Sequence, residues 1–167
     1  MVVGKHKKKT QIKIKIGILT ISTSRTLDND KSGAWIKKFS SKEGCEVLIH
    51  KVIPDHEGLI KENTLSSIND FNLNALLITG GTGISDKDVT IEAVKPLFYK
   101  ELTAFGPIFT LLSFEEIDSA AILSRATAGI IGKTIVFCMP GSLNACKLAC
   151  KNIIFPELGH ILNHVNE

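Results

Sequence analysis

Residues 75–90 read ALLITGGTGISDKDVT, an apolar run of five residues followed at once by a glycine-rich turn and two aspartates. A short segment that is apolar at every position is typical of a strand buried on both faces, as in the centre of a parallel sheet. The loop that leaves such a strand lies at its carboxyl end, where ligands bind in open α/β sheets. This stretch therefore predicts both the class of fold and the place of a functional site.

Strand and helix patterns alternate along the rest of the chain. Further strands are predicted at residues 12–21, 45–53 and 134–139, because each segment is alternating or almost wholly apolar. Helices are predicted at residues 33–42, 57–69, 91–98, 108–116, 119–128, 144–152 and 155–165. Strands that alternate with helices predict an α/β fold, in which a mostly parallel open sheet is the middle of three layers, α/β/α.

Capping residues and helix breakers set the expected ends of these helices. Ser32 is the expected N-cap of helix 33–42, and Asp88 or Thr90 is the expected cap of helix 91–98. FGP at residues 105–107 is expected to break the chain before helix 108–116, and Gly129 is expected to end helix 119–128. No repeat or linker interrupts residues 10–167. A single domain is therefore expected over residues 12–167.

The basic charge of the chain is concentrated at its N-terminus. Six of the 20 lysine and arginine residues, and no acidic residue, fall in residues 1–15, so the remainder has 14 basic against 17 acidic residues. Residues 1–11 are expected to be a disordered basic tail. Such a tail could contact nucleic acid or another anionic surface, but a solvated tail is the favoured interpretation, because the body is mildly acidic and has no basic, aromatic-studded stretch.

The sequence shows neither a membrane span nor a secretion signal. No apolar run reaches the roughly 18 residues that a spanning helix needs, and the N-terminal lysines precede an alternating segment, not an apolar one. A cytoplasmic location without a membrane partner is expected. Cys146 and Cys150 share a helix face and could form half of a soft-metal site, but small buried apolar residues in a reducing compartment are the favoured interpretation.

Three loops of similar composition leave the carboxyl ends of predicted strands. They are STSR at 22–25, GGTGISDKD at 80–88 and PGS at 140–142, and each leads toward a helix N-terminus. Backbone N–H groups and the helix dipole favour anions there, and glycines let the backbone approach phosphate oxygens. The glycine-rich loop matches neither the Walker A nor the GxGxxG pattern, so a tight connection without a ligand remains an alternative.

Carboxylates beside these loops suggest a magnesium site. Asp86 and Asp88 follow the glycines, and carboxylates next to phosphate-binding loops are typical of Mg²⁺ sites, although one of the two could instead cap a helix. Asp55 follows the strand at 45–53 and is either a further ligand or a turn residue. The residues alone predict a phosphoryl or nucleotide site assisted by Mg²⁺, and they indicate no covalent nucleophile.

Several short motifs occur in a fixed order along the chain. They are SR at 24–25, DKSG at 30–33, IPD at 53–55, TGGTG at 79–83 with DVT at 88–90, and LSRA at 123–126 with PGS at 140–142. In this combination they resemble the MogA/MoaB family of molybdenum cofactor biosynthesis proteins, and MoaB most of all. The resemblance covers about residues 14–162, and the order of the motifs is what makes it specific.

The resemblance implies a parallel-sheet fold that assembles as homotrimers or homohexamers and works with other proteins of cofactor biosynthesis. The implied activity is the adenylylation of molybdopterin by ATP with Mg²⁺, which prepares the cofactor for insertion of molybdenum or tungsten. Asp55 and Asp88 become the catalytic candidates, and Asp86 and Asp88 the candidate Mg²⁺ ligands. The residues expected to contact nucleotide or pterin are Ser22, Ser24, Thr79, Gly80, Gly81, Thr82, Gly83, Ser113, Pro140, Gly141 and Ser142.

Two positions depart from the family pattern. Lys87 stands where an arginine often precedes the aspartate, which keeps the charge but loses a bidentate fork. Pro107, in AFGP at 104–107, stands where the family often has a glutamate. The loss of this acid favours an alternative function, a non-catalytic carrier or scaffold that binds molybdopterin or a nucleotide. The intact Asp55 and Asp88 favour the enzyme.

Overall fold

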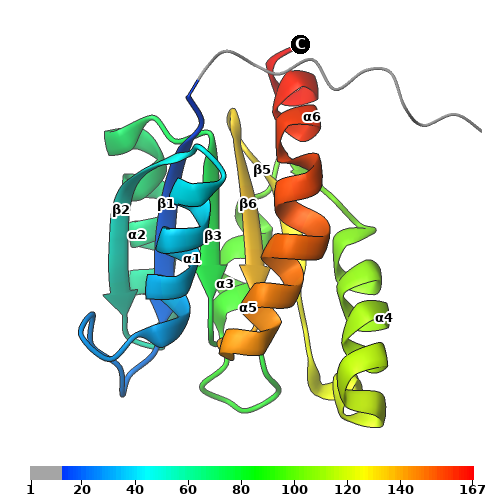
Figure 1. Ribbon diagram of the computed structural model, residues 1–167. Coiled ribbons are helices and arrows are strands. Elements are labelled where there is room, and N and C mark those ends of the chain that lie inside the picture. Colours follow the sequence, from blue (N-terminus) through cyan, green and yellow to red (C-terminus); the bar gives the residue numbers. More distant parts are fainter. Residues whose placement is uncertain (1–12) are drawn as a thin grey trace, which may run out of the picture.

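The computed structural model describes residues 13–167, and a six-stranded sheet forms its centre (Figure 1). Four strands are parallel: β1 (Lys15–Ile21), β2 (Glu46–Ile53), β3 (Ala75–Thr79) and β6 (Thr134–Met139). β5 (Thr127–Ile131) runs antiparallel to β6, and β4 (Lys100–Glu101) runs antiparallel to β5. The strand order β2-β1-β3-β6-β5-β4 confirms the predicted α/β class with a mostly parallel sheet.

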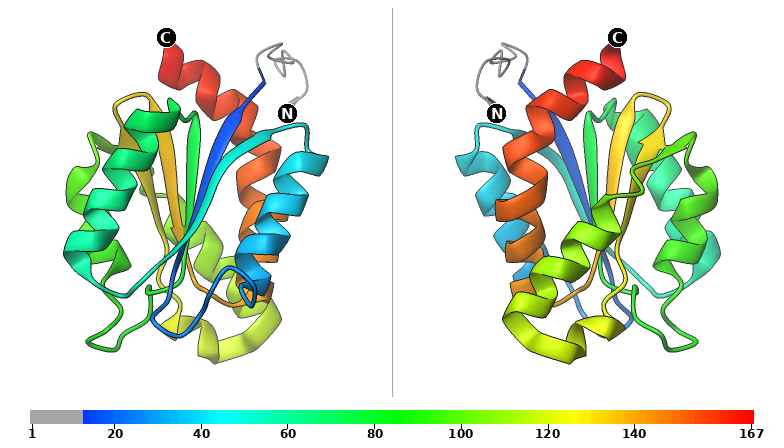
Figure 2. Two further views of the ribbon diagram at one scale, coloured as in Figure 1. Left: turned by 90° about the vertical axis from the view of Figure 1, so that its left-hand side faces the viewer. Right: turned by 90° about the vertical axis from the view of Figure 1, so that its right-hand side faces the viewer.

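Helices cover both faces of the sheet, as the two side views show (Figure 2). One face packs against α1 (Lys31–Lys42), α4 (Phe105–Ile117), α5 (Leu143–Ala149) and α6 (Phe155–Asn166). The other face packs against α2 (Glu57–Phe71) and α3 (Thr90–Val94). The sheet is therefore the middle layer of three, as predicted.

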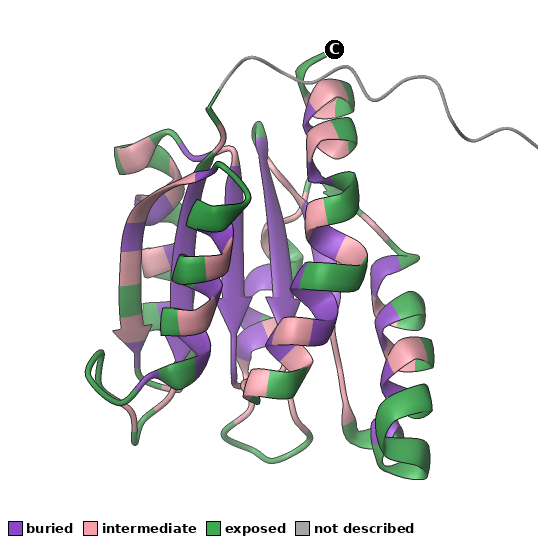
Figure 3. Ribbon diagram, in the orientation of Figure 1, coloured by how far each residue is buried: buried purple, intermediate pink, exposed green. Residues whose placement is uncertain are grey.

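The central strands are buried on both sides (Figure 3). Every residue of β3 and of β6 is buried. Successive side chains point to opposite faces, so Leu77 packs in the core under α1 and α5, whereas Leu76 packs in the core over α2. A strand with a core on each side needs apolar residues at almost every position, which is why the run at 75–79 predicts it correctly.

The largest error of the sequence prediction concerns residues 119–128, which form no α-helix. Asp118–Leu123 is a 3-10 turn and Thr127–Ile131 is β5, a strand that was not predicted. Small residues favour a helix locally, but β5 pairs with both β4 and β6 and buries its first residues, so tertiary pairing overrides local preference. Gly129 ends no helix. It lies inside β5, where a Cβ would meet the ring of Phe98.

The start of α1 also differs from the prediction. Asp30, and not Ser32, is the N-cap, because Oδ1 of Asp30 accepts a hydrogen bond from the backbone N–H of Gly33 at 3.0 Å. The hydroxyl of Ser32 instead donates to the carbonyl oxygen of Gly141 at 2.8 Å. The serine therefore connects α1 to the loop after β6.

α3 and α4 begin differently from the prediction as well. α3 has no side-chain cap and is followed by a 3-10 turn at Lys95–Leu97, since Asp88 and Thr90 make their hydrogen bonds within the glycine-rich loop. α4 starts at Phe105. The FGP segment at residues 105–107, which was expected to break the chain before this helix, therefore forms its first turn. Pro107 is tolerated there because the first N–H groups of a helix have no partner within it. Further along, α5 continues into α6 through a π-helical turn.

The basic tail predicted at residues 1–11 lies outside the described residues, so the division into a tail and one domain stays a prediction. Within residues 13–167 the structure contains no helix that is both long and apolar enough to span a bilayer. All four cysteines are buried free thiols, which confirms the burial predicted for Cys146 and Cys150. Burial raises the pKa of the Cys146 thiol to about 11.

Candidate functional site

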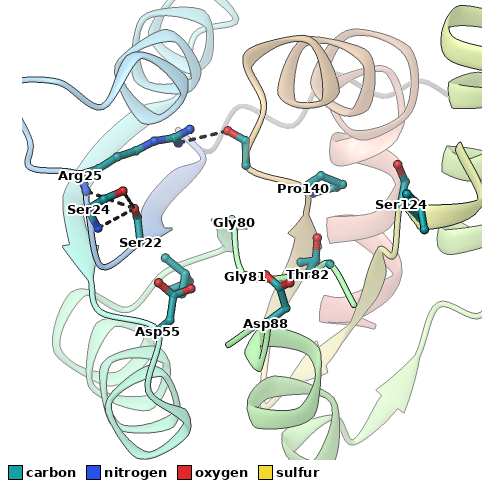
Figure 4. A pocket seen from close by; sticks show the side chains of 14 residues that line it. Ser22, Ser24, Arg25, Asp55, Gly80, Gly81, Thr82, Asp88, Ser124 and Pro140 are labelled. Carbon is teal, nitrogen blue, oxygen red and sulfur yellow. Dashed lines mark hydrogen bonds between the residues drawn. The ribbon is translucent and has the colours of Figure 1, made fainter. Parts of the chain in front are cut away.

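The carboxyl ends of β1, β2, β3 and β6, together with the segment before β5, surround a pocket of about 300 Å³ (Figure 4). This volume is at the low end of the range for small-molecule sites. Glycines, hydroxyl groups and two carboxylates dominate the lining, which consists of Ile21, Ser22, Ser24, Arg25, Asp55, Gly80, Gly81, Thr82, Gly83, Asp88, Leu123, Ser124, Pro140 and Gly141.

Most of the predicted site residues line this pocket, but four lie outside its lining. Thr79 is buried at the end of β3, where its hydroxyl donates to a carbonyl of the loop after β6 at 2.9 Å. Ser142 is the N-cap of α5. Asp86 is exposed in the glycine-rich loop, and Ser113 is buried in α4. The ligand contacts expected of these four residues stay predictions.

Ser22 and Arg25 shape the loop after β1. Oγ of Ser22 accepts hydrogen bonds from the backbone N–H groups of Ser24 at 3.3 Å and Arg25 at 3.2 Å. Nη1 of Arg25 donates to the carbonyl oxygen of Gly141 at 3.1 Å, which connects this loop to the loop after β6. Arg25 supplies the only positive charge among the described residues that line the pocket. It was not among the predicted contacts, although the SR motif contains it.

A buried carboxylate lies behind Arg25. Oδ2 of Asp30 accepts a hydrogen bond from Oγ1 of Thr20 at 2.6 Å and lies 2.9 Å from Nε2 of His50, while Oδ1 lies 3.9 Å from Nη1 of Arg25. Burial raises the pKa of Asp30, but hydrogen bonds from Thr20, Gly33 and His50 outweigh it and hold this pKa below its usual value. The ionised Asp30 thus caps the start of α1 and lies beside the guanidinium of Arg25.

Asp55 faces the glycine-rich loop from the end of β2 (Figure 4). Its Oδ2 accepts hydrogen bonds from the backbone N–H of Thr23 at 2.7 Å and from Oγ1 of Thr23 at 2.8 Å. Its Oδ1 lies on the side of Gly81, where a Cβ would be 3.2 Å away. Oδ2 of Asp55 therefore holds the loop after β1 in place, and Oδ1 remains on the side of the pocket.

Gly80 and Gly81 turn the chain with positive φ angles of 95° and 63°. A Cβ on Gly80 would meet the carbonyl oxygen of Ile21, and a Cβ on Gly81 would meet the hydroxyl of Thr90. That hydroxyl donates to the carbonyl of Gly80 at 2.8 Å, and the N–H of Thr90 donates to the carbonyl of Gly81 at 2.9 Å. The two glycines thus allow the loop to lie directly on β1 and on the start of α3.

Asp88 folds back over its own loop. Its Oδ2 accepts hydrogen bonds from Oγ of Ser85 at 2.7 Å and from the backbone N–H of Ser85 at 3.0 Å. These bonds, with the Ser85 hydroxyl as the largest cause, outweigh the effect of burial and hold the pKa of Asp88 below its usual value. Asp88 is therefore ionised at neutral pH, and its charge lies at the pocket wall.

Arg125 holds the glycine-rich loop from the side of β5. Its Nε donates to the carbonyl oxygens of Thr82 at 2.9 Å and Gly83 at 3.0 Å, and its Nη2 lies 3.4 Å from the carbonyl oxygen of Asp88. Glu92 on α3 pairs with Nη1 at 2.6 Å, and this pairing with Arg125 holds the pKa of Glu92 below its usual value. The guanidinium thus fixes the loop through its backbone.

Arg125→Lys is expected to loosen residues 80–88 without a change in charge. An ammonium group has no planar fork with which to bond several carbonyls at once, so we expect a loss of about 1–2 kcal/mol in the free energy of unfolding. Hydrogen exchange of the loop amides should become faster than in wild type. Glu92→Gln is the control, because it removes the ion pair and leaves the carbonyl bonds; unchanged exchange in Arg125→Lys would contradict the assigned role.

The charges of the pocket favour a cation as well as an anion. One guanidinium and two carboxylates leave the lining with a net negative charge, so a phosphorylated ligand would be repelled unless a cation came with it. In the described part of the chain, no group of three or more His, Cys, Asp or Glu side chains is placed to hold a metal ion. An ion here would need oxygens of the ligand and of water besides a protein carboxylate, which is common for Mg²⁺.

Comparisons with known proteins give a consistent result. A family model described as "Probable molybdopterin binding domain" matches residues 17–160. Molybdenum cofactor biosynthesis protein B of Bacillus subtilis (strain 168) is 42% identical over 168 residues, which cover 100% of this chain and 99% of the relative. A protein of Methanocaldococcus jannaschii named "Probable molybdopterin adenylyltransferase" is 42% identical over 161 residues, 92% of this chain and 95% of the relative.

A solved structure extends the similarity to three dimensions. The crystal structure of the tungsten cofactor synthesizing protein MoaB from Pyrococcus furiosus matches with a TM-score of 0.84 at 40% identity. The match covers 93% of this chain and 98% of that one. The two proteins therefore share the same fold over nearly their whole length.

Proposed function

The chain belongs to the molybdopterin-binding family that includes MogA and MoaB, and on this basis we propose that it acts in molybdenum or tungsten cofactor biosynthesis as a molybdopterin adenylyltransferase. In the proposed reaction, an oxygen of the terminal phosphate of molybdopterin bonds to the α-phosphorus of ATP. The bond from that phosphorus to the bridging oxygen breaks, and pyrophosphate leaves. A cytoplasmic location and contacts with other proteins of the pathway stay predictions from the sequence.

The observation that carries the proposal is the pocket itself, which joins glycine-rich backbone, one guanidinium and two carboxylates at the ends of four strands. Transfer between two anions needs positioning and neutralisation of charge more than an acid or a base. Arg25 is suited to a phosphate oxygen, and Gly80 and Gly81 let a phosphate approach the backbone closely. Because the pocket is small, we expect it to enclose the reacting phosphates, with the remainder of each substrate over the rim.

The donor set of the pocket fits Mg²⁺. Carboxylate oxygens are the hard ligands that Mg²⁺ prefers, and Asp88 and Asp55 each bring one to the pocket. Bound Mg²⁺ would supply charge stabilisation for the phosphate oxygens and the leaving pyrophosphate. Ser85 orients Asp88 through two hydrogen bonds, and Thr23 orients Asp55 in the same way. Asp86 is the weaker candidate ligand, since it lies outside the pocket lining.

The alternative function, a non-catalytic carrier or scaffold, was favoured by Pro107. That residue is exposed in the first turn of α4 and is not among the residues that line the pocket. A missing acid at this position therefore leaves the charge of the pocket within this chain unchanged. Intact Asp55 and Asp88 at the pocket wall favour the enzyme.

The deciding experiment incubates the purified protein with molybdopterin, ATP and Mg²⁺ and separates the products by chromatography. Adenylylated molybdopterin and an equal amount of pyrophosphate are the expected products. Tight binding of molybdopterin without any product would favour the carrier. Failure to bind either molybdopterin or ATP would contradict both functions.

We also propose that the protein is a homo-oligomer, a trimer or hexamer, as the family resemblance implies. Support comes from α4, which exposes apolar side chains at a spacing of three residues, so that each lies next to the following one and they form a stripe that winds around the helix. Contiguous exposed apolar surface is typical of a protein–protein interface. The stripe consists of Ile108, Leu111, Phe114 and Ile117.

Leu111→Lys is expected to shift the protein from its oligomer to the monomer, because a lysine at the middle of the stripe would bury an unpaired charge in the interface. Size-exclusion chromatography with light scattering measures the mass directly. Leu65→Lys on α2 is the matched control, since Leu65 is also exposed but lies on the opposite helical layer. An unchanged mass in Leu111→Lys would remove α4 from the interface.

A further inference from the structure

Two histidines stand one turn apart on α6, outside the pocket. The rings of His160 and His164 are 4.7 Å apart, and their Nε2 atoms are separated by 2.9 Å. Both side chains are more than half exposed. The end of α6 that carries them lies at the edge of the molecule away from the loops that form the pocket (Figure 1). The pair is thus separate from the proposed active site.

A carboxylate faces the other ring nitrogen of each histidine. Nδ1 of His160 lies 3.4 Å from Oε2 of Glu157, and Nδ1 of His164 lies 3.2 Å from Oε2 of Glu167. An ionised carboxylate only accepts hydrogen bonds, so this contact favours the tautomer with the ring hydrogen on Nδ1. In a neutral imidazole Nε2 is then a lone pair. With this tautomer on both rings, the two Nε2 lone pairs face each other at 2.9 Å, and a cation bound by both would remove their repulsion.

We propose that His160 and His164 form a two-nitrogen chelate for a divalent transition-metal ion. Imidazole is a preferred ligand of nickel, copper and zinc. With metal–nitrogen bonds of about 2.0–2.1 Å, two nitrogens at a right angle are about 2.9 Å apart, whereas a tetrahedral angle needs about 3.3–3.4 Å. The separation of 2.9 Å matches the right angle. The site is therefore suited to Ni²⁺ or Cu²⁺, which favour square-planar or tetragonal geometry, more than to Zn²⁺.

The two carboxylates serve as orienting partners of the histidines. A carboxylate that accepts from the distal N–H of a metal-bound histidine fixes the ring and raises its basicity. Within residues 13–167 no group of three or more His, Cys, Asp or Glu side chains is placed to hold a metal ion. Water would therefore occupy the coordination positions that the two histidines leave open. The predicted site is accordingly an exposed chelate on one helix, open to a further ligand.

The test is a calorimetric titration of the full chain with NiCl₂. Wild type should bind one ion at this site. Glu167→Gln should weaken binding by about 10–100-fold, the usual effect of losing such a partner, and His164→Gln should weaken it further. Binding that is equally strong in His164→Gln would place the ion elsewhere and overturn the proposal, as would the absence of any Ni²⁺ binding in wild type, which would mean that only a proton lies between the rings.

A variant with the same number of histidines separates chelation from mere histidine content. His164→Asn combined with Val165→His moves the second ring by one residue, about 100° around the helix, so the two imidazoles no longer share a face. This double variant should bind Ni²⁺ as weakly as His164→Gln. Circular dichroism of each variant checks that α6 is still formed. Wild-type affinity in the double variant would contradict the chelate.

Discussion

Asp88→Asn is expected to reduce the kcat of molybdopterin adenylylation by about 10²–10³-fold, the range found when one preorganised electrostatic group is removed from an active site. Asparagine keeps an oxygen that can accept the two hydrogen bonds from Ser85, so the loop should retain its shape. What the variant loses is the ionised carboxylate at the pocket wall. The effect should therefore fall on turnover and on the Mg²⁺ requirement, and little on molybdopterin binding.

Product chromatography over a series of Mg²⁺ concentrations measures this effect. The matched control is Asp70→Asn, which removes an exposed carboxylate near the end of α2. That control should keep wild-type turnover and an unchanged Mg²⁺ dependence. Wild-type turnover in Asp88→Asn would show that this carboxylate does not support the metal, and would leave Asp55 as the candidate.

Gly80→Ala is expected to cause the largest loss of stability among the loop substitutions. Its φ of 95° alone costs a residue with a side chain about 1–3 kcal/mol. A further cost arises because the added methyl group would meet the carbonyl oxygen of Ile21, and this backbone lies inside the sheet. Since β1 cannot move without disturbing its neighbours, the loop must shift, and adenylylation should be lost as well.

Urea unfolding compares this variant with Gly44→Ala. Gly44 also has a strongly positive φ, 83°, but a Cβ there would meet no atom within 4 Å. The control therefore isolates the strain of the backbone angle from the steric clash. We expect Gly80→Ala to lose clearly more free energy of unfolding than Gly44→Ala. Equal losses would mean that β1 and the loop accommodate the methyl group.

The central part of the fold could be predicted from the sequence because burial controls it. β3 and β6 lie between two cores, so nearly all of their residues are apolar, and no tertiary information is required to recognise them. α1 and α2 were placed to within about two residues at each end, the usual uncertainty of helix boundaries. Gly44 follows α1 closely and has a positive φ, which is common for a glycine just after the end of a helix.

The antiparallel edge of the sheet could not be predicted in the same way. β5 contains Thr127, Ala128 and Gly129, and its position depends on pairing with β4 and β6, which no local pattern reports. This error also concealed part of the site. Because β5 runs opposite to β6, its first residues lie at the carboxyl end of the parallel strands, and this brings Ser124 to the pocket and Arg125 to the glycine-rich loop.

For the site, the sequence could indicate which loops meet, because the carboxyl ends of parallel strands share one edge. It could not indicate how the loops are joined. The hydrogen bond from Arg25 to Gly141 spans 116 residues, and the one from Thr23 to Asp55 spans 32. Contacts of this kind leave no periodic or local signal. The N-cap of α1 illustrates the limit. Ser32 was the expected cap, but Asp30, two residues earlier, caps the helix.

The two edges of the sheet bear on aggregation. An edge strand offers unpaired N–H and C=O groups to another chain, and long flat edges promote the growth of fibrils. β4 is only two residues long, both of its residues are charged, and Glu101 pairs with Lys95 at 3.0 Å. At the opposite edge, β2 carries Glu46 and Lys51. We therefore expect the sheet to resist strand-by-strand addition at either side, which would leave the helical layers as the surfaces where copies of the chain can associate.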